Sequence, residues 1–131
     1  MNFILKWLFI GFIIFSQISC SVKKEKITIL ENKDLQSQMM ELYAEGYEAF
    51  LERDILFAAK KFNEAEKLFP QSEWAPKASL MAAYSYYAQD YYGDAIAELE
   101  RFIKVYPYHQ NLDYAYYLLG ICFYEQIVDE K

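Results

Sequence analysis

The chain has 131 residues, of which 55% are hydrophobic and 19% aromatic, and its formal net charge at pH 7 is -6. A protein with this net negative charge is repelled by phosphate backbones, so nucleic-acid binding through a basic surface is disfavoured. Only 4 glycines and 3 prolines, with no low-complexity run, leave little room for disorder or for an all-β fold rich in tight turns. We therefore expect one small, all-α domain.

The N-terminal segment has the layout of a secretory signal. Lys6 precedes the apolar run WLFIGFIIF at 7–15, and more polar residues lead from there to Cys20. As a helix, the thirteen residues 3–15 reach about 20 Å, which is short of the ~30 Å hydrocarbon thickness of a bilayer. We expect a signal peptide at 1–19, with an uncleaved membrane anchor as the alternative.

The tetrad QISC at 17–20 resembles the signal of bacterial lipoproteins, in which the cysteine is acylated and becomes the first residue of the mature chain. The resemblance implies a covalent lipid on Cys20, and several acyl chains hold a protein on a membrane far more firmly than one. Ser21 stands where an aspartate resembles the inner-membrane retention mark, so the resemblance favours the outer membrane. The alternative is an ordinary cysteine beside an ordinary cleavage site.

The rest of the chain is an internal repeat with a step of 37 residues. Small residues recur at Gly46, Ala83 and Gly120, and prolines recur at Pro70 and Pro107. At Gly46 and Ala83 we expect a neighbouring helix to approach closely. Apolar positions follow the 3.6-residue period, and the residue before each proline is expected to close a helix. The predicted helices cover residues 35–52, 55–69, 74–89, 92–105 and 111–128.

This recurring helix pair, with small residues in its first helix and a closing proline, resembles the tetratricopeptide repeat. In the first unit, five residues sit at the spacing of that motif: Gly46, Ala58, Phe62, Ala65 and Pro70. The resemblance implies a tetratricopeptide-like helix-pair solenoid over residues 35–131, after a lipidated N-terminus and linker at 20–34. The third unit stops after its first helix, so either that helix is a terminal cap or the sequence is the front part of a longer chain.

No catalytic or metal-binding constellation emerges from the sequence. His109, the only histidine, lies between two predicted helices, where a turn or capping role is favoured over that of a metal ligand or general base. Cys122 is expected to behave as a small hydrophobe. Acidic residues such as Glu66 and Glu98 are spaced as solvated helix faces, without an acid and base pair. We predict a protein with no enzymatic activity, metal or cofactor, apart from the lipid on Cys20.

The first helices of the repeats are predicted to line a peptide-binding groove. In helix-pair solenoids these helices form the concave surface, and the residues beside their packing stripe face it. Eight of the nine residues so placed are aromatic, and tyrosine couples a large apolar face to a hydroxyl that can stay wet. The alternative is that these rings only fill the inner curve of a tight superhelix. The predicted groove residues are Tyr43, Tyr47, Phe50, Leu80, Tyr84, Tyr87, Tyr114, Tyr117 and Tyr124.

From about residue 38 onward the chain resembles the N-terminal half of the BamD (ComL) family of outer-membrane assembly lipoproteins. The most specific part is RFIKVYPYHQNLDYAYYLLG at 101–120. The resemblance implies a scaffold of the β-barrel assembly machinery, lipid-anchored at the periplasmic face of the outer membrane of a Gram-negative bacterium. It implies as partners unfolded outer-membrane proteins, whose C-terminal signals the N-terminal repeats receive, and the β-barrel assembly subunit with its accessory lipoproteins. The alternative is another envelope-tethered tetratricopeptide-repeat lipoprotein that acts as a structural adaptor.

Overall fold

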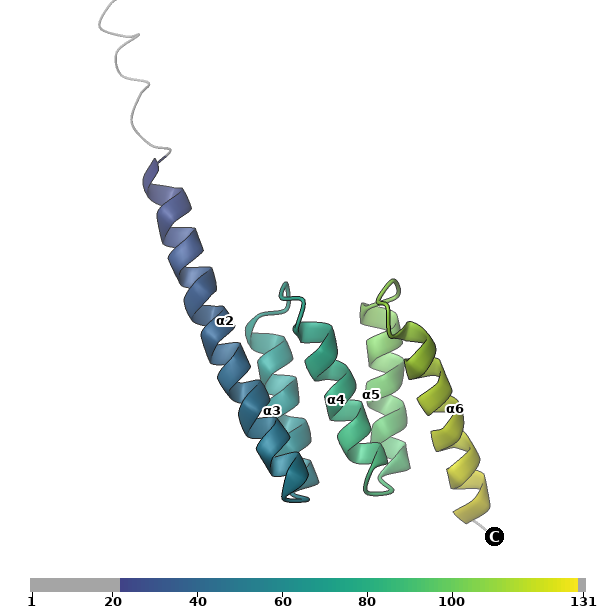
Figure 1. Ribbon diagram of the computed structural model, residues 1–131. Coiled ribbons are helices and arrows are strands. Elements are labelled where there is room, and N and C mark those ends of the chain that lie inside the picture. Colours follow the sequence, from purple (N-terminus) through teal and green to yellow (C-terminus); the bar gives the residue numbers. More distant parts are fainter. Residues whose placement is uncertain (1–21, 130–131) are drawn as a thin grey trace, which may run out of the picture. The chain divides into compact units, whose positions relative to one another are not determined.

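The computed structural model describes residues 22–129, so the predicted signal peptide at 1–19 and Cys20 lie outside the described residues. The described part contains five helices and no strand, which confirms the all-α prediction. In chain order they are α2 (Val22–Leu51), α3 (Ile55–Leu68), α4 (Ala75–Tyr87), α5 (Tyr92–Val105) and α6 (Leu112–Asp129) (Figure 1). None of these described helices combines the length and the apolar composition needed to cross a membrane.

The first helix begins much earlier than expected. α2 starts at Val22, so the predicted start at residue 35 is wrong, and the segment 22–34 that we assigned to a linker is helical. This segment, VKKEKITILENKD, contains no proline or glycine and is rich in lysine and glutamate, which are good helix formers. It lacks the sustained apolar period on which the prediction relied. All other helix ends lie within two residues of the predicted ones.

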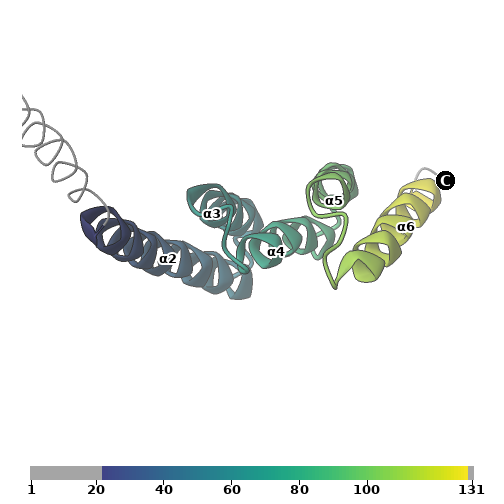
Figure 2. The ribbon, with the colours of Figure 1, turned by 90° about the horizontal axis from the view of Figure 1, so that it is seen from above.

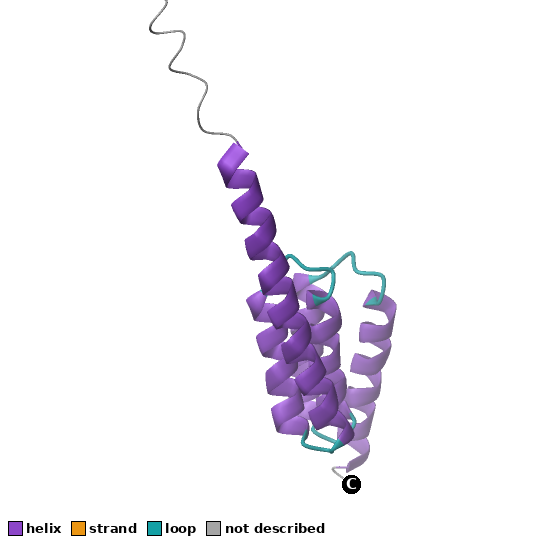
Figure 3. Ribbon diagram, turned by 60° about the vertical axis from the view of Figure 1, so that its left-hand side comes forward, coloured by secondary structure: helices purple, strands orange, loops and turns teal. Residues whose placement is uncertain are grey.

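The chain divides into two compact units between Lys33 and Asp34, and the second unit holds α3 to α6 with the C-terminal part of α2. Seen from above, α3 and α5 form one layer of this second unit, while its part of α2 lies with α4 and α6 in the other (Figure 2). α3 packs against α4, α4 against α5 and α5 against α6, with short loops at both ends of the helices (Figure 3). The predicted helix pairs are therefore confirmed, with the first helix of each repeat in one layer.

Local sequence sets the helix ends. Asp54 precedes α3, and its side chain accepts a hydrogen bond from the backbone N–H of Phe57 at 3.3 Å, which caps the helix. Pro76 lies in the first turn of α4, where its missing N–H has no intrahelical partner to lose. α3 and α5 are capped by Phe69 and Tyr106, each the residue before a proline, as predicted.

Small residues allow the two layers to approach closely in the first repeat. A Cβ atom added to Gly46 of α2 would lie 3.1 Å from two ring atoms of Phe62, which is fully buried in α3. Ala83 of α4, one repeat later, is fully buried as well. At Gly120 of α6, an added Cβ would meet no described atom within 4 Å. The predicted close approach is thus confirmed at Gly46, whereas nothing in the described residues requires it at Gly120.

Candidate functional site

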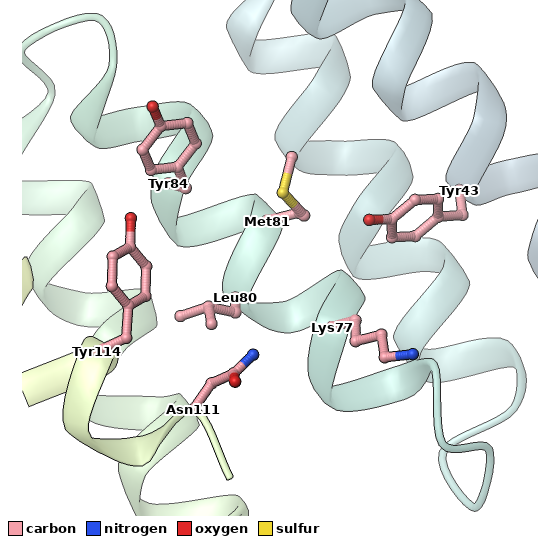
Figure 4. Close-up of a pocket in the computed structure, with 7 residues that line it drawn as sticks. All are labelled: Tyr43, Lys77, Leu80, Met81, Tyr84, Asn111 and Tyr114. Carbon is pink, nitrogen blue, oxygen red and sulfur yellow. The ribbon is translucent and has the colours of Figure 1, made fainter. Parts of the chain in front are cut away.

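An open pocket lies on the layer formed by the first helices of the repeats (Figure 4). Its volume is about 320 Å³, at the lower end of the range of ligand sites in proteins. One lining residue comes from α2, four come from α4, and two come from the start of α6 and the turn before it. They are Tyr43, Lys77, Leu80, Met81, Tyr84, Asn111 and Tyr114.

The α4 residues reach the pocket together because of their spacing. Leu80 and Met81 lie three and four positions after Lys77, and Tyr84 lies three and four positions after Met81 and Leu80, so all four share one face of the helix. Leu80 is buried, at 7% exposure, and belongs to the hydrophobic core between α4, α5 and α6. The floor of the pocket is therefore core, and its walls are the partly exposed side chains around Leu80.

Tyr43 is held in place by two other aromatic rings. Its ring meets Phe62 edge-on with 5.1 Å between centroids, and meets Trp74 of the α3–α4 loop in the same way at 5.5 Å. Burial, with a smaller effect of the nearby Tyr47, raises the pKa of the Tyr43 phenol above its ordinary value. The hydroxyl, which is protonated at neutral pH even at the ordinary value, is available as a hydrogen-bond donor.

Aromatic contacts extend from the pocket along the same layer. The ring of Tyr84 lies 5.8 Å from that of Phe50 and 6.1 Å from that of Tyr87. On α6, the rings of Tyr114 and Tyr117 are 6.5 Å apart. These spacings are within the range of favourable aromatic pairs, so the rings around the pocket support one another's positions.

The structure brings together four of the nine predicted groove residues, since Tyr43, Leu80, Tyr84 and Tyr114 line the pocket. Phe50, Tyr87 and Tyr117 do not line it but contact Tyr84 or Tyr114 through their rings. Tyr47 and Tyr124 are 47% and 65% exposed and are not among the lining residues. Tyr43, Phe50, Tyr84 and Tyr87 also pack against core clusters, which accords with the alternative that the rings fill the inner curve. Peptide binding stays a prediction.

Three lining residues were missed from the sequence. Lys77 and Met81 sit three positions before and one after Leu80, so projecting the whole face of α4 would have found them. Asn111 lies in the turn before α6, where no period applies. Its backbone N–H donates to Nδ1 of His109 at 3.2 Å, and the His109 ring meets Phe102 edge-on at 5.7 Å. The predicted turn role of His109 is thereby confirmed.

Lys77 is the one charged residue among those that line the pocket. Its ammonium nitrogen lies 4.1 Å from the ring centroid of Trp74, a cation–π contact. None of the ion pairs formed within the described residues involves Lys77. The pocket therefore combines an aromatic and aliphatic lining with a single cation that forms no ion pair with the described residues.

A polar network occupies the other side of α4 and joins the two repeats. Arg101 of α5 donates from Nη1 and Nη2 to the two carboxylate oxygens of Glu66 of α3, at 2.9 and 2.7 Å. It also donates from Nε to Glu98 at 2.9 Å and from Nη2 to Ser79 of α4 at 3.0 Å. The Tyr106 hydroxyl donates to Glu66 at 2.7 Å. We call these five residues the Arg101 network.

The network corrects the prediction that Glu66 and Glu98 belong to solvated helix faces. Glu66 is buried, at 5% exposure, and Glu98 is half-buried. The reason is that Arg101 and Tyr106 give Glu66 charge-assisted hydrogen bonds that offset the loss of water. The bond to Glu66 in turn raises the pKa of Arg101, while burial and then the same carboxylate raise the pKa of Tyr106.

Comparison with known proteins assigns the sequence to a protein family. The YfiO family, described as outer membrane lipoprotein, matches residues 35–131. The outer membrane protein assembly factor BamD of Caulobacter vibrioides is 35% identical over 115 residues, which cover 87% of this chain and 36% of that protein. The factor of the same name from Neisseria gonorrhoeae is 36% identical over 85 residues, or 65% of this chain and 32% of its own length. The chain thus spans about a third of the length of these relatives.

Proposed function

Since this chain belongs to the YfiO family of outer membrane lipoproteins, we propose that it is a non-catalytic scaffold for the assembly of outer-membrane β-barrel proteins. Its relatives carry the name outer membrane protein assembly factor. Its partners are then unfolded outer-membrane proteins and the other subunits of the assembly machinery. The family match extends over α3 to α6 and most of α2, so the pocket lies inside the matched region.

The observation that carries this proposal is the convergence of Tyr43, Tyr84 and Tyr114 on one open pocket. The three rings come from three different helices, α2, α4 and α6, and line the same pocket as the buried side chain of Leu80. Binding energy at protein interfaces concentrates in aromatic residues that surround such a pocket. The scaffold therefore receives, at this pocket, the aromatic end of the C-terminal signal of an unfolded barrel protein.

Titration with a peptide tests the pocket. The peptide carries the sequence of a terminal barrel strand and ends in phenylalanine, and binding is measured for the unaltered chain and for Tyr84→Ala with Tyr114→Ala. We expect the double variant to lose about 1 to 3 kcal/mol of binding free energy, because truncating central aromatic residues weakens binding most. Circular dichroism verifies that the variant keeps its helix content.

The matched control is Tyr108→Ala. Tyr108 is 98% exposed and is not among the residues lining the pocket. The same truncation there is expected to leave the affinity unchanged. Equal affinity for the unaltered chain and the double variant would remove the pocket as the binding site.

The attachment to the membrane is a separate part of the proposal. A covalent lipid on Cys20 anchors the protein at the periplasmic face of the outer membrane, as the lipoprotein-like tetrad at 17–20 suggests. Cys20→Ser is expected to move the protein from the membrane fraction to the soluble fraction of cells. If the variant stays in the membrane fraction, the segment 1–19 acts as an uncleaved anchor instead.

A further inference from the structure

We propose that Lys77 determines the specificity of this pocket by binding the terminal carboxylate of a peptide whose last residue is aromatic. The inference rests on the proposed function and deepens it, because it names the chemistry that the same pocket selects. Three features carry it: the charge at the pocket, the arrangement of its lining, and the pocket's size.

The charge of the pocket has the opposite sign to the net charge of the chain. The formal net charge is -6, yet the one charged residue that lines the pocket is a lysine. Some cations of the described part have carboxylates of their own, since Lys61 pairs with Glu45 at 2.7 Å and Arg101 with Glu66 at 2.7 Å, whereas Lys77, like Lys67 and Lys104, is in none of the ion pairs. The ammonium of Lys77 faces the Trp74 ring instead. A ligand that brings a carboxylate supplies the complementary charge that no ion pair among the described residues provides.

The lining places this cation and the tyrosine rings on opposite sides of Leu80 (Figure 4). Lys77 lies on the side of Tyr43, and its ammonium points away from Leu80 and Asn111, toward the Trp74 ring. Tyr84 and Tyr114 stand on the other side. A bound group with a negative end and an aromatic end therefore has one orientation that satisfies both sides, with its carboxylate toward Lys77 and its ring toward the two tyrosines.

The size of the pocket selects the chain terminus as the source of the carboxylate. A volume of about 320 Å³ is at the lower end of the range of ligand sites, so few side chains of a bound peptide enter the pocket itself. In a C-terminal aromatic residue, the carboxylate and the ring are attached to the same Cα atom, so a single residue supplies both. An internal glutamate or aspartate would need a second residue in the pocket to supply the ring.

The fluorescence of the neighbouring Trp74 provides a signal for binding. The Trp74 ring contacts both Lys77 and Tyr43, and its backbone N–H donates to the Ser72 hydroxyl at 3.1 Å, which holds the loop. A carboxylate that draws the ammonium off the ring changes the surroundings of Trp74. The other tryptophan is Trp7, so Trp7→Phe leaves Trp74 as the sole fluorescent indole of the full chain.

The experiment compares two peptides that differ in one group. Both have the sequence of a terminal barrel strand ending in phenylalanine; one has a free C-terminal carboxylate and the other a C-terminal amide. Their binding to the Trp7→Phe chain is followed by Trp74 fluorescence and by calorimetry. We expect the free acid to bind about five- to tenfold more tightly, which is below the range for a buried charge-assisted hydrogen bond because Lys77 is partly exposed.

Two variants assign this preference to its residue. In Lys77→Met, both peptides are expected to bind as weakly as the amide binds the unaltered chain, because the cation is gone while the side-chain volume is kept. Lys60→Met is the matched control: Lys60 lies on α3, its side chain is 67% exposed, and it is not among the lining residues. Its preference for the free acid is expected to be unchanged.

The outcomes separate this inference from the proposed function. Equal binding of acid and amide to the unaltered chain, or a preference that survives Lys77→Met, would overturn the role of Lys77 while leaving the pocket in place. Failure of both peptides to bind would overturn the proposed function as well. A third peptide, amidated and with glutamate as its penultimate residue, tests the source of the charge. If it matches the free acid, the assignment to the chain terminus is wrong.

Discussion

Two regions on opposite sides of α4 use a cation in opposite ways. In the Arg101 network, the guanidinium is hydrogen-bonded to Glu66, Glu98 and Ser79, and the network joins α3, α4 and α5. In the pocket, Lys77 has no ion-pair partner within the described residues and lies over the ring of Trp74. The guanidinium of Arg101 is engaged by carboxylates and a hydroxyl of the fold. The ammonium of Lys77, by contrast, is available to a ligand.

The difference shows how one helix serves both stability and binding. Ser79 and Leu80 are neighbours in α4, and their side chains leave the helix about 100° apart, since there are 3.6 residues per turn. Ser79 is fully buried and accepts from Arg101, while Leu80 forms the floor of the pocket. Substitutions on the network side are therefore expected to change folding free energy, and those on the pocket side binding free energy.

The largest expected effect comes from removing the network cation. Arg101→Met leaves Glu66 buried without its cation, and removing one partner of a buried pair costs about 3 to 5 kcal/mol. Because the Arg101 side chain is 36% exposed, water reaches it, and we expect a loss at the lower end, about 3 kcal/mol. The measurement is urea unfolding followed by circular dichroism at neutral pH.

A double variant checks the cause of that loss. Replacing both members of a buried ion pair with apolar residues of similar size is often nearly neutral. Arg101→Met with Glu66→Met is therefore expected to be more stable than Arg101→Met alone. If the two substitutions instead add, the loss comes from packing rather than from an uncompensated carboxylate, and the contrast between the two cations weakens.

Apart from the start of α2, the helices and the packing stripe could be predicted from the sequence, but the Arg101 network could not. The proline at the end of each repeat and the apolar period predicted the ends of α3 and α5 and the close contact at Gly46. A period assigns residues to faces, and it cannot say which face meets another helix. Glu66 looked like a solvated residue because its partner Arg101 is 35 positions away.

The pocket was partly readable for the same reason. Tyr43, Tyr84 and Leu80 were predicted because each lies beside the packing stripe of a first helix. Lys77 was missed because a lysine on a helix face is usually solvated, and nothing in the local sequence shows that it borders an aromatic pocket. Asn111 was missed because it belongs to a turn, whose geometry depends on the hydrogen bond to His109.

An intermediate effect is expected at Tyr106, which donates to Glu66 at 2.7 Å. Tyr106→Phe removes this bond, and a hydrogen bond to a charged group contributes about 1.5 to 3 kcal/mol. We expect a loss of about 1.5 kcal/mol at neutral pH, because Arg101 continues to satisfy the carboxylate. A loss as large as that of Arg101→Met would mean that the tyrosine, rather than the cation, holds Glu66 in place.

The same tyrosine predicts a pH dependence. Burial and the bond to Glu66 raise the pKa of Tyr106 in the folded state above its ordinary value of 10.0. A raised pKa means that its contribution is complete below pH 10.0 and is lost as the pH rises toward the folded-state pKa. The free energy of unfolding is measured at neutral pH and at a pH above 10.0. The decrease between the two is expected to be smaller for Tyr106→Phe than for the unaltered chain. Identical alkaline losses would contradict the assignment.

The smallest effect is expected from removing the pocket cation, and it is the sharpest test of the comparison. Lys77→Met makes the same type of change as Arg101→Met but removes only a partly exposed cation–π contact, which contributes about 0.5 to 1 kcal/mol. Methionine keeps most of the packing of the lysine stem, so we expect the free energy of unfolding to change by less than about 1 kcal/mol. Lys60→Met, at an exposed 3.8 Å pair with Glu64, provides the baseline for a surface lysine. A loss for Lys77→Met close to that for Arg101→Met would show that the fold already uses this cation, and the distinction between a structural and a ligand-binding charge would no longer hold.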